Sequence, residues 1–193
     1  MAKIKICGLR REEDVSYVNE LLPDYTGFIL TEGFRRTIDF ETVAKLREKL
    51  SNKITPVGVF VNDSLENINR FLNAGIISVV QLHGNESAAF CEKINAPVIK
   101  FFKPSMFDSI KDYSAVQYFL FDSGTGTGKT FQWSKIPTVQ KPFFLAGGLD
   151  ENNLKEAINR VRPYCVDMSS SVETNGVKDY DKIKRVMEIV RNE

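Results

Sequence analysis

Residues 54–73 read ITPVGVFVNDSLENINRFLN, and this stretch contains the alternation that decides the fold. Its first part, Ile54–Val61, is a short apolar run rich in β-branched residues, which favours a buried strand. Asp63 and Ser64 are typical of the start of a helix, and in Leu65–Asn73 the apolar residues recur three and four positions apart. The stretch therefore predicts one strand followed by one helix.

The same pattern recurs along the whole chain. We expect strands at Lys3–Cys7, Tyr25–Thr31, Ile54–Val61, Ile77–Leu82, Val98–Phe102, Tyr118–Phe121, Phe143–Ala146 and Cys165–Met168. We expect helices at Glu12–Leu22, Phe40–Leu50, Leu65–Asn73, Glu86–Lys93, Met106–Lys111, Asn153–Val161 and Tyr180–Arg191. The strand starts are 20 to 29 residues apart and no linker rich in Gly, Ser or Pro divides them, so we expect residues 1–193 to form one domain.

Eight such units in one domain predict an α/β fold, a single-domain (β/α)8 TIM barrel, because parallel strands joined by right-handed crossovers can close on themselves. An open doubly wound sheet shows the same alternation and is the alternative. Its usual G-x-G-x-x-G motif after the first strand is absent, since Cys7–Arg10 contains a single glycine. The sequence favours the barrel.

The charges of the chain nearly balance, with 26 Lys and Arg against 25 Asp and Glu and a net charge of +1. This balance argues against a nucleic-acid or membrane partner. Cys7, Cys91 and Cys165 are too far apart for a C-x-x-C pair, so we expect neither a disulfide framework nor a metal site. No apolar stretch approaches the roughly 18 residues that cross a bilayer. Together with the absence of a signal-peptide pattern, this predicts a cytoplasmic protein.

Polar residues follow the predicted strands, where a parallel barrel places its active site. These residues are Cys7, Arg35, Arg36, Asn62, Gln81, His83, Lys103, Asp122, Gly147, Gly148, Asp167, Ser169, Ser170 and Ser171. A cysteine, an aspartate and a histidine are thus expected at one mouth, together with two arginines. We interpret this mouth as a site for a small anionic substrate.

Two loops near the end of the chain indicate that this substrate is phosphorylated. Gly147-Gly148 and Ser169-Ser170 place backbone N–H groups and hydroxyls after strands seven and eight, where barrels of this class commonly bind phosphate. A tight turn and a solvated serine loop would explain either loop alone. Their occurrence on adjacent strands favours a phosphate site.

Cys7 and Asp122 are the candidate base and acid. Cys7 is the last residue of its strand, and basic neighbours would favour its thiolate. Asp122 ends the apolar run Tyr118–Phe121, where desolvation favours the protonated carboxyl that a general acid needs. A core role for Cys7 and a capping role for Asp122 remain open at this stage. His83 is equally well explained as a satisfied core residue or as a substrate contact.

The glycine-rich run Asp122–Thr130 is close to a phosphate-binding Walker A loop. Walker A requires a glycine five residues before its Gly-Lys pair, but that position here is Ser123, and the nearest glycine is Gly124. We therefore interpret the run as a lid that Lys129 anchors over the site.

Motifs from nearly the whole chain together resemble phosphoribosylanthranilate isomerase. They are Lys5–Leu9, Gly58–Asn62, Val80–Gly84, Gly126–Phe131 with Trp133, Leu145–Leu149, Val166-Asp167, Ser169-Ser170, Val172-Glu173 and Gly176–Asp179. Each motif is weak by itself, but their joint order and spacing are specific.

The resemblance implies a barrel that catalyses the Amadori rearrangement of N-(5-phosphoribosyl)anthranilate to 1-(2-carboxyphenylamino)-1-deoxyribulose 5-phosphate in tryptophan biosynthesis, without cofactor or metal. It implies that Asp122 protonates the furanose oxygen, that Cys7 removes the C2′ proton and that Arg36 binds the anthranilate carboxylate. The remaining expected contacts are Gln81, His83 and Asp167 to the substrate and Gly147, Gly148, Ser169 and Ser170 to its phosphate. The expected assembly is a monomer or a homodimer.

Three positions depart from the family pattern. Phe34-Arg35 replaces the usual Ser-Pro before Arg36, Gln132 replaces an Asp before Trp133, and Ser171 replaces a Gly. Two alternatives remain. One is another sugar-phosphate isomerase or epimerase, because phosphate loops and an acid/base pair on a barrel serve many reactions; a metal-dependent epimerase would need more histidines than His83 alone. The other is a nucleotide-binding switch protein, which the glycine spacing disfavours.

Overall fold

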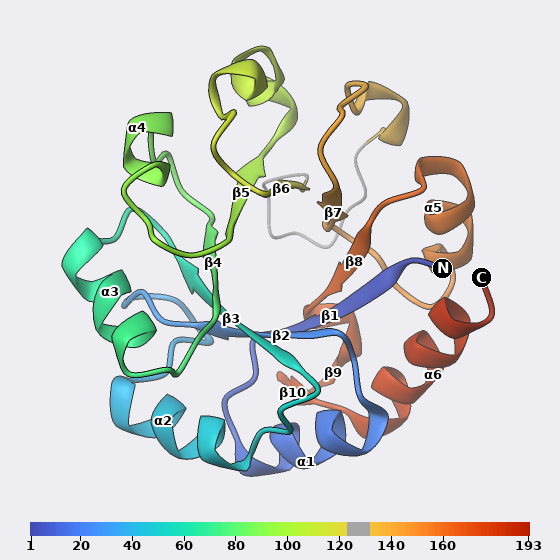
Figure 1. The fold of residues 1–193 in the computed structure, drawn as a ribbon. Coiled ribbons are helices and arrows are strands. Elements are labelled where there is room, and N and C mark those ends of the chain that lie inside the picture. Colours follow the sequence, from blue (N-terminus) through green and yellow to red (C-terminus); the bar gives the residue numbers. More distant parts are fainter. Residues whose placement is uncertain (123–131) are drawn as a thin grey trace.

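The computed structural model describes residues 1–122 and 132–193, and eight parallel strands in it form a closed barrel in sequence order (Figure 1). The strands are β1 Lys3–Cys7, β2 Tyr25–Ile29, β3 Thr55–Phe60, β4 Val79–Leu82, β5 Val98–Phe102, β6 Tyr118–Phe121, β7 Phe143–Leu145 and β8 Cys165–Met168. Each overlaps its prediction, with ends that differ by at most two residues. The (β/α)8 prediction is confirmed.

Helices surround the strands on the outside (Figure 1). The α-helices are α1 Glu12–Leu21, α2 Phe40–Lys49, α3 Leu65–Asn73, α4 Ala88–Cys91, α5 Leu154–Val161 and α6 Tyr180–Arg191, and the 3-10 helices are η1 Pro104–Asp112, η2 Trp133–Lys135 and η3 Ser170–Val172. Side chains of Asp39, Ser64 and Asp179 accept backbone N–H groups at the starts of α2, α3 and α6. These caps set the helix starts.

Two predicted helices are wrong in detail. The helix expected at Glu86–Lys93 is only the single turn α4. Glu86 lies before its start, since its carboxylate turns inward and accepts the backbone N–H groups of Asn62 and Gly84, and Ser87 caps the turn. The α-helix expected at Met106–Lys111 is instead part of the 3-10 helix η1.

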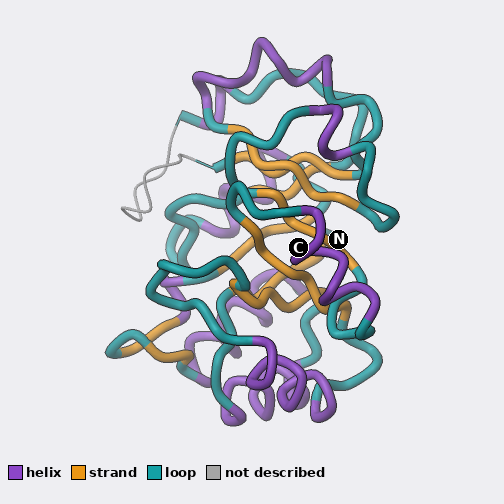
Figure 2. The backbone as a smooth tube through the Cα atoms, turned by 90° about the vertical axis from the view of Figure 1, so that its left-hand side faces the viewer, coloured by secondary structure: helices purple, strands orange, loops and turns teal. Residues whose placement is uncertain are grey.

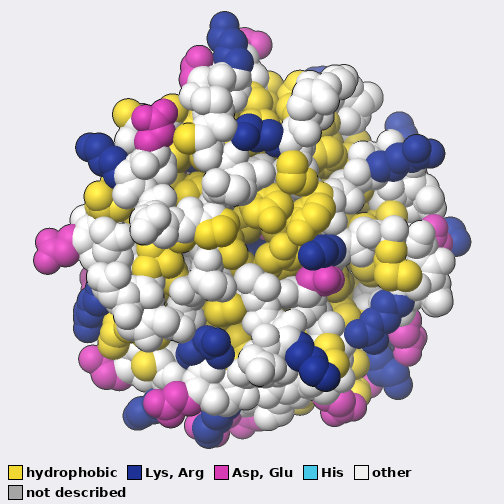
Figure 3. Space-filling view, viewed as in Figure 1, with side chains coloured by type: hydrophobic (Ala, Val, Ile, Leu, Met, Phe, Trp, Pro, Cys, Tyr) yellow, Lys and Arg dark blue, Asp and Glu magenta, His cyan; other side chains and the backbone are white. Residues whose placement is uncertain are grey.

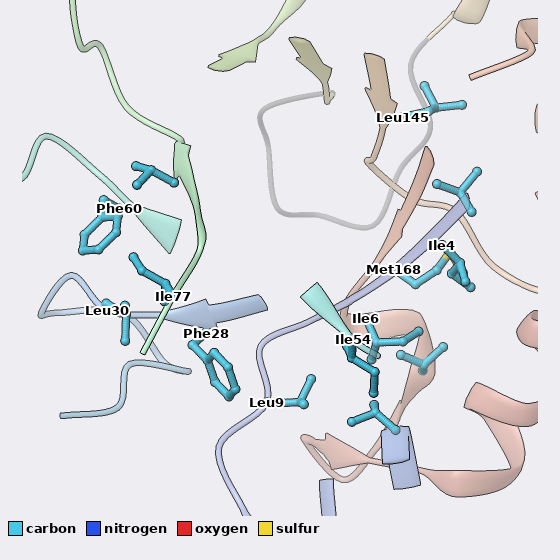
Figure 4. Packing of buried hydrophobic residues seen from close by; sticks show 14 of the residues in the cluster. Ile4, Ile6, Leu9, Phe28, Leu30, Ile54, Phe60, Ile77, Leu145 and Met168 are labelled. Carbon is cyan, nitrogen blue, oxygen red and sulfur yellow. The ribbon is translucent and has the colours of Figure 1, made fainter. Parts of the chain in front are cut away.

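The core has two layers, because successive residues of a strand point to opposite sides. The outer layer lies between strands and helices, and Figure 4 shows Ile4, Ile6, Phe28 and Leu145 among its members. The inner layer fills the barrel with the side chains of Val57, Val79, Ile99, Leu120 and Phe144. This alternation on β1 leaves Lys5 and Cys7 inside the barrel.

A short hairpin follows β8 and stands apart from the barrel (Figure 2). It consists of β9 Glu173–Thr174 and β10 Val177–Lys178, which pair antiparallel. Asn175 and Gly176 make the turn with positive φ angles of 52° and 79°, as tight hairpin turns require. The hairpin brings Glu173 and Lys178 opposite each other.

The N-terminal end of the barrel is closed by aromatic side chains. Tyr25, Tyr118, Phe144 and Tyr164 form ring contacts with centroids 5.3 to 5.9 Å apart. On the face of the molecule in Figure 3, apolar side chains gather over the middle, and most charged side chains lie toward the edge, although some border the apolar middle. No helix in the described parts of the chain is long and apolar enough to cross a membrane.

Candidate active site

A cavity of about 570 Å³ lies at the C-terminal ends of the strands. It is lined by all ten residues that the sequence singled out as catalytic, substrate-binding or phosphate-binding: Cys7, Arg36, Gln81, His83, Asp122, Gly147, Gly148, Asp167, Ser169 and Ser170. Arg35, Ser171 and Phe34 also line it. Two further polar residues lie elsewhere: Asn62 lines a separate cleft with residues of α2 and α3, and Lys103 is exposed at the start of η1. Lys129 and the predicted lid lie outside the described residues.

Cys7 and Asp122 reach the cavity from β1 and β6, which are not neighbours in the barrel. Cys7 is 7% exposed, and Asp122 is half-buried. Burial raises the pKa of Cys7, and the positive charges of Lys5 and Lys178 offset only part of this effect. Lys5 and Lys178 thus favour the thiolate, in the direction expected from the sequence, but burial outweighs them and the net effect is a raised pKa of Cys7.

Gly27 makes room for the Cys7 side chain. It pairs with Cys7 in the register of β1 and β2. A Cβ atom on Gly27 would lie 2.6 Å from Cys7 Sγ and 3.1 Å from Lys5 Cε. Any side chain at this position would push Cys7 or Lys5 away from the interior of the barrel.

Lys5 is a fully buried cation beneath the cavity. Its Nζ lies 2.7 Å from Asp167 Oδ2 and 2.7 Å from Gln81 Oε1, and it also interacts with the thiol of Cys7. Burial lowers the pKa of Lys5, but Asp167 and Cys7 outweigh it, so that the net shift is upward. Lys5 therefore stays charged and fixes two of the predicted substrate contacts, Gln81 and Asp167.

Only one of the two carboxylate oxygens of Asp167 accepts a hydrogen bond from the described residues. Oδ2 pairs with Lys5, whereas Oδ1 has no hydrogen-bond partner within the described ranges. Burial raises the pKa of Asp167, and Lys5 offsets part of that rise. A buried acceptor of this kind is suited to a ligand hydroxyl or N–H group.

His83 is held flat against the interior of the barrel. Its ring stacks on Phe101 with centroids 4.2 Å apart and an angle of 16° between planes, and Nδ1 lies 3.0 Å from Gln81 Nε2. Burial lowers the pKa of His83 to about 4, although Asp122 acts in the opposite direction. His83 is thus a neutral, positioned ring at neutral pH.

The predicted phosphate loops lie side by side at the rim. Gly147 and Gly148 have φ angles of 85° and 68°, a region in which side chains are strained. Ser169 donates from Oγ to the backbone carbonyl of Cys7 at 3.2 Å, and Ser170 is exposed. The serine loop is therefore attached directly to the residue proposed as the base.

Arg36 is held by Glu173, a residue to which the sequence gave no role. Arg36 Nε donates to Glu173 Oε1 at 2.7 Å and Nη2 donates to Oε2 at 2.9 Å. Arg35 Nη2 donates to Oε2 at 3.0 Å, and Lys178 Nζ donates to Oε1 at 2.9 Å. Burial raises the pKa of Glu173, but the hydrogen bonds from Arg36 and Lys178 outweigh it and lower the pKa to about 2. Glu173 is therefore a carboxylate that binds three cations.

Gly8 allows Arg36 to reach this position. Gly8 has a φ of 85°, and a Cβ on it would lie 2.7 Å from Arg36 Cδ. The glycine in the motif Lys5–Leu9 therefore has a physical reason, because a side chain at this position would collide with Arg36.

Sequence reasoning missed Lys5, Glu173 and Lys178 as parts of the site. Lys5 had a usable signal, because it lies two residues before Cys7 on the same face of β1. Glu173 and Lys178 stood in a quoted motif, but only the hairpin pairing places them together. No group of three or more His, Cys, Asp or Glu side chains that could hold a metal ion occurs in residues 1–122 and 132–193.

Known proteins match this chain along almost its entire length. A family model described as N-(5'phosphoribosyl)anthranilate (PRA) isomerase matches residues 4–189. The chain is 46% identical to the N-(5'-phosphoribosyl)anthranilate isomerase of Endomicrobium trichonymphae, over 100% of both chains. It is similar to the crystal structure of phosphoribosyl anthranilate isomerase from Thermotoga maritima, with a TM-score of 0.88, 32% identity and 100% coverage of each chain. A structure of the same enzyme in complex with reduced 1-(o-carboxyphenylamino)-1-deoxyribulose 5-phosphate has a TM-score of 0.86 and 30% identity, also over 100% of both chains.

Proposed function

The chain belongs to the N-(5'-phosphoribosyl)anthranilate isomerase family and catalyses that isomerisation in tryptophan biosynthesis, and we propose that Cys7 is its base and Asp122 its acid. The reaction opens the ribose ring and moves the carbonyl from C1′ to C2′. It needs one proton delivered to the ring oxygen and one removed from C2′. A single acid and a single base on different sides of the substrate meet that requirement.

In the proposed first step, Asp122 transfers its proton to the furanose oxygen, the bond from C1′ to that oxygen breaks, and the nitrogen lone pair forms a Schiff base. In the second step, Cys7 removes the C2′ proton and the electrons move toward nitrogen, which gives an enolamine. Tautomerisation to the ketone completes the rearrangement. The support is positional, since Cys7 ends β1, Asp122 directly follows β6, and both line one cavity.

The raised pKa of Cys7 constrains this mechanism. Burial disfavours the thiolate, and the positive charges of Lys5 and Lys178 act in the opposite direction, so we assign these two lysines the role of favouring the thiolate that the second step needs.

The remaining contacts orient the substrate. We assign the phosphate to Gly147, Gly148, Ser169 and Ser170, and the anthranilate carboxylate to Arg36. Asp167 Oδ1 is the acceptor available to a ribose hydroxyl, with Gln81 and the neutral His83 beside it. We further propose that the reaction needs no metal or cofactor, that the protein works in the cytoplasm, and that its assembly is a monomer or a homodimer.

A fluorescence assay with freshly made phosphoribosylanthranilate tests the assignment. Cys7→Ala and Asp122→Ala should each lower kcat by about 10²-fold or more, as removal of a positioned base or acid does. Cys91→Ala is the matched control, because Cys91 is buried in α4 away from the cavity, and it should be nearly silent. Abolished turnover in Cys91→Ala with normal turnover in Cys7→Ala would show that the base is wrongly assigned. Loss of activity in EDTA would contradict the metal-free mechanism.

A further inference from the structure

We propose that Glu173 is a positioning residue that presents Arg36 to the carboxylate of the substrate, with Lys178 linking this pair to the phosphate loop. The inference rests on the proposed role of Arg36. It assigns a function to the hairpin β9–β10, which the acid, the base and the phosphate loops do not explain.

The geometry of the pair carries the argument. Glu173 engages the side edge of the guanidinium, formed by Nε and Nη2, through two bonds of 2.7 and 2.9 Å. A guanidinium has a second edge, formed by Nη1 and Nη2, which also carries two parallel N–H groups. One arginine can therefore bind an internal carboxylate by one edge and a substrate carboxylate by the other. Side-on pairing to Glu173 fixes the plane and direction of that second edge.

The support beneath Glu173 is rigid. Its side chain is 5% exposed, and Lys182 Nζ donates to its backbone carbonyl at 2.7 Å. Glu173 pairs with Lys178 across the hairpin, and Arg11 Nη2 donates to the Lys178 carbonyl at 3.3 Å. Because these contacts hold the hairpin in place, the Glu173 side chain loses little conformational entropy when the ligand binds.

The charges around Glu173 favour a second anion. Arg35, Arg36 and Lys178 all donate to this one carboxylate, so three positive charges share one negative charge. The excess positive charge lies at the wall of the cavity, where a substrate carboxylate would compensate it. Arg36 is the better placed arginine, with a side chain 17% exposed and two bonds, whereas Arg35 is 57% exposed with one bond.

Lys178 extends the arrangement to the other end of the site. Its Nζ donates both to Glu173 Oε1 and to the Ser169 carbonyl at 3.0 Å. Ser169 in turn bonds the backbone of Cys7. A single chain of contacts thus runs from the arginine assigned to the carboxylate to the loop assigned to the phosphate, and it fixes the distance between the two anchors.

The test measures binding of two ligands by calorimetry: reduced 1-(o-carboxyphenylamino)-1-deoxyribulose 5-phosphate, and its anilino counterpart without the carboxylate. Although Glu173→Gln leaves more positive charge at the cavity wall, it should weaken binding of the carboxylated ligand about tenfold or more, because Arg36 loses the orientation that lets it bind the carboxylate. Binding of the anilino ligand should stay within about twofold. In the isomerase assay, KM should rise more than kcat falls. In an Arg36→Ala background, Glu173→Gln should have little further effect on either ligand, because both changes remove the same contact. Glu188→Gln, at an exposed carboxylate of α6, is the matched control and should bind both ligands normally.

The outcomes separate this inference from the proposed function. If Arg36→Ala leaves the affinity for the carboxylated ligand unchanged, the role of Arg36 itself is wrong. If Arg36→Ala weakens that ligand but Glu173→Gln does not, or if Glu173→Gln weakens both ligands equally, the positioning role is overturned. Should Glu173→Gln fail to fold, Glu173→Asp keeps the charge and shortens the side chain by one methylene group. It should then show the same selective loss for the carboxylated ligand, and an equal loss for both ligands would overturn the inference.

Discussion

Lys5 Nζ lies 2.7 Å from Asp167 Oδ2, and the two residues are direct partners in the pairing of β1 with β8. The pair is almost completely removed from solvent, and it lies beneath the residue proposed as the base. A buried charge that keeps its partner is tolerated, but a buried charge that loses it is costly. The site therefore carries a buried ion pair beside Cys7, in which Lys5 favours the thiolate and Asp167 opposes it.

We predict that Lys5→Met makes Cys7 less reactive. Burial already raises the pKa of Cys7, and Lys5 is the largest influence in the opposite direction, so its removal should raise that pKa further. Alkylation of the Cys7 peptide by iodoacetamide at pH 8, followed by mass spectrometry, should therefore be slower in Lys5→Met than in the parent, because a smaller fraction of the thiol is ionised.

The Cys91 peptide is the internal control, because Cys91 lies outside the cavity and its alkylation should not change. The double variant Lys5→Met/Asp167→Leu removes both charges and separates the loss of the cation from the exposure of a lone carboxylate. Unchanged alkylation of Cys7 in Lys5→Met would show that the lysine does not influence the thiol.

The barrel and most of its mouth could be predicted from the sequence for one physical reason. Parallel strands in a barrel end at the same face, so the residues that close each apolar run must lie together. Cys7, Asp122 and Asp167 come from strands far apart in the chain, and all line one cavity. Their convergence could therefore be predicted without knowing any side-chain contact.

The supporting charges could not be predicted in the same way. A lysine or glutamate in a sequence usually indicates a solvated surface, whereas Lys5, Lys100, Glu173 and Lys178 are buried. Only the pairing of distant segments provides their partners. Whether the pKa of Cys7 is raised or lowered also depends on the balance between burial and nearby charges. That balance follows only from the three-dimensional structure.

The pH dependence of His83 gives a second prediction. The folded-state pKa is about 4, below the ordinary value of 6.5, so the unfolded chain takes up a proton at a higher pH than the folded chain does. His83 therefore contributes stability that is present above pH 6.5 and is lost as the pH falls from 6.5 through 4. Each pKa unit corresponds to about 1.4 kcal/mol.

His83 is the only histidine, so its ring protons can be followed directly by NMR in the native protein. We expect a titration midpoint near pH 4. Urea unfolding of His83→Asn should show a smaller loss of stability between pH 6.5 and 4 than the parent chain. A midpoint near 6.5 would mean that the ring is solvated rather than stacked on Phe101.

The buried pair of Lys100 and Glu86 gives a third prediction, about stability. Lys100 Nζ lies 2.8 Å from Glu86 Oε2 and 2.7 Å from the Gly84 carbonyl, and both side chains are almost fully buried. Lys100→Met should lower the free energy of unfolding by about 3–5 kcal/mol, because it leaves the Glu86 charge buried without its partner.

The double variant Lys100→Met/Glu86→Gln should recover part of that loss. Glutamine removes the unpaired charge but can still accept the backbone N–H groups of Asn62 or Gly84. Urea unfolding of the parent and both variants measures the difference. A double variant less stable than Lys100→Met would show that the isolated charge is not the cause.

The last prediction concerns the phosphate and depends on backbone geometry more than on charge. Gly147 and Gly148 both have positive φ angles, which valine disfavours strongly. Gly147→Val should therefore move the loop away from the phosphate and weaken binding of the reduced product analogue severely. Removal of the phosphate from the analogue should weaken its binding to the parent protein by a similar factor. The two losses should not add, because both delete the same interaction. Calorimetric titration of both analogues against both proteins measures the four affinities, and fully additive losses would place the phosphate elsewhere in the cavity.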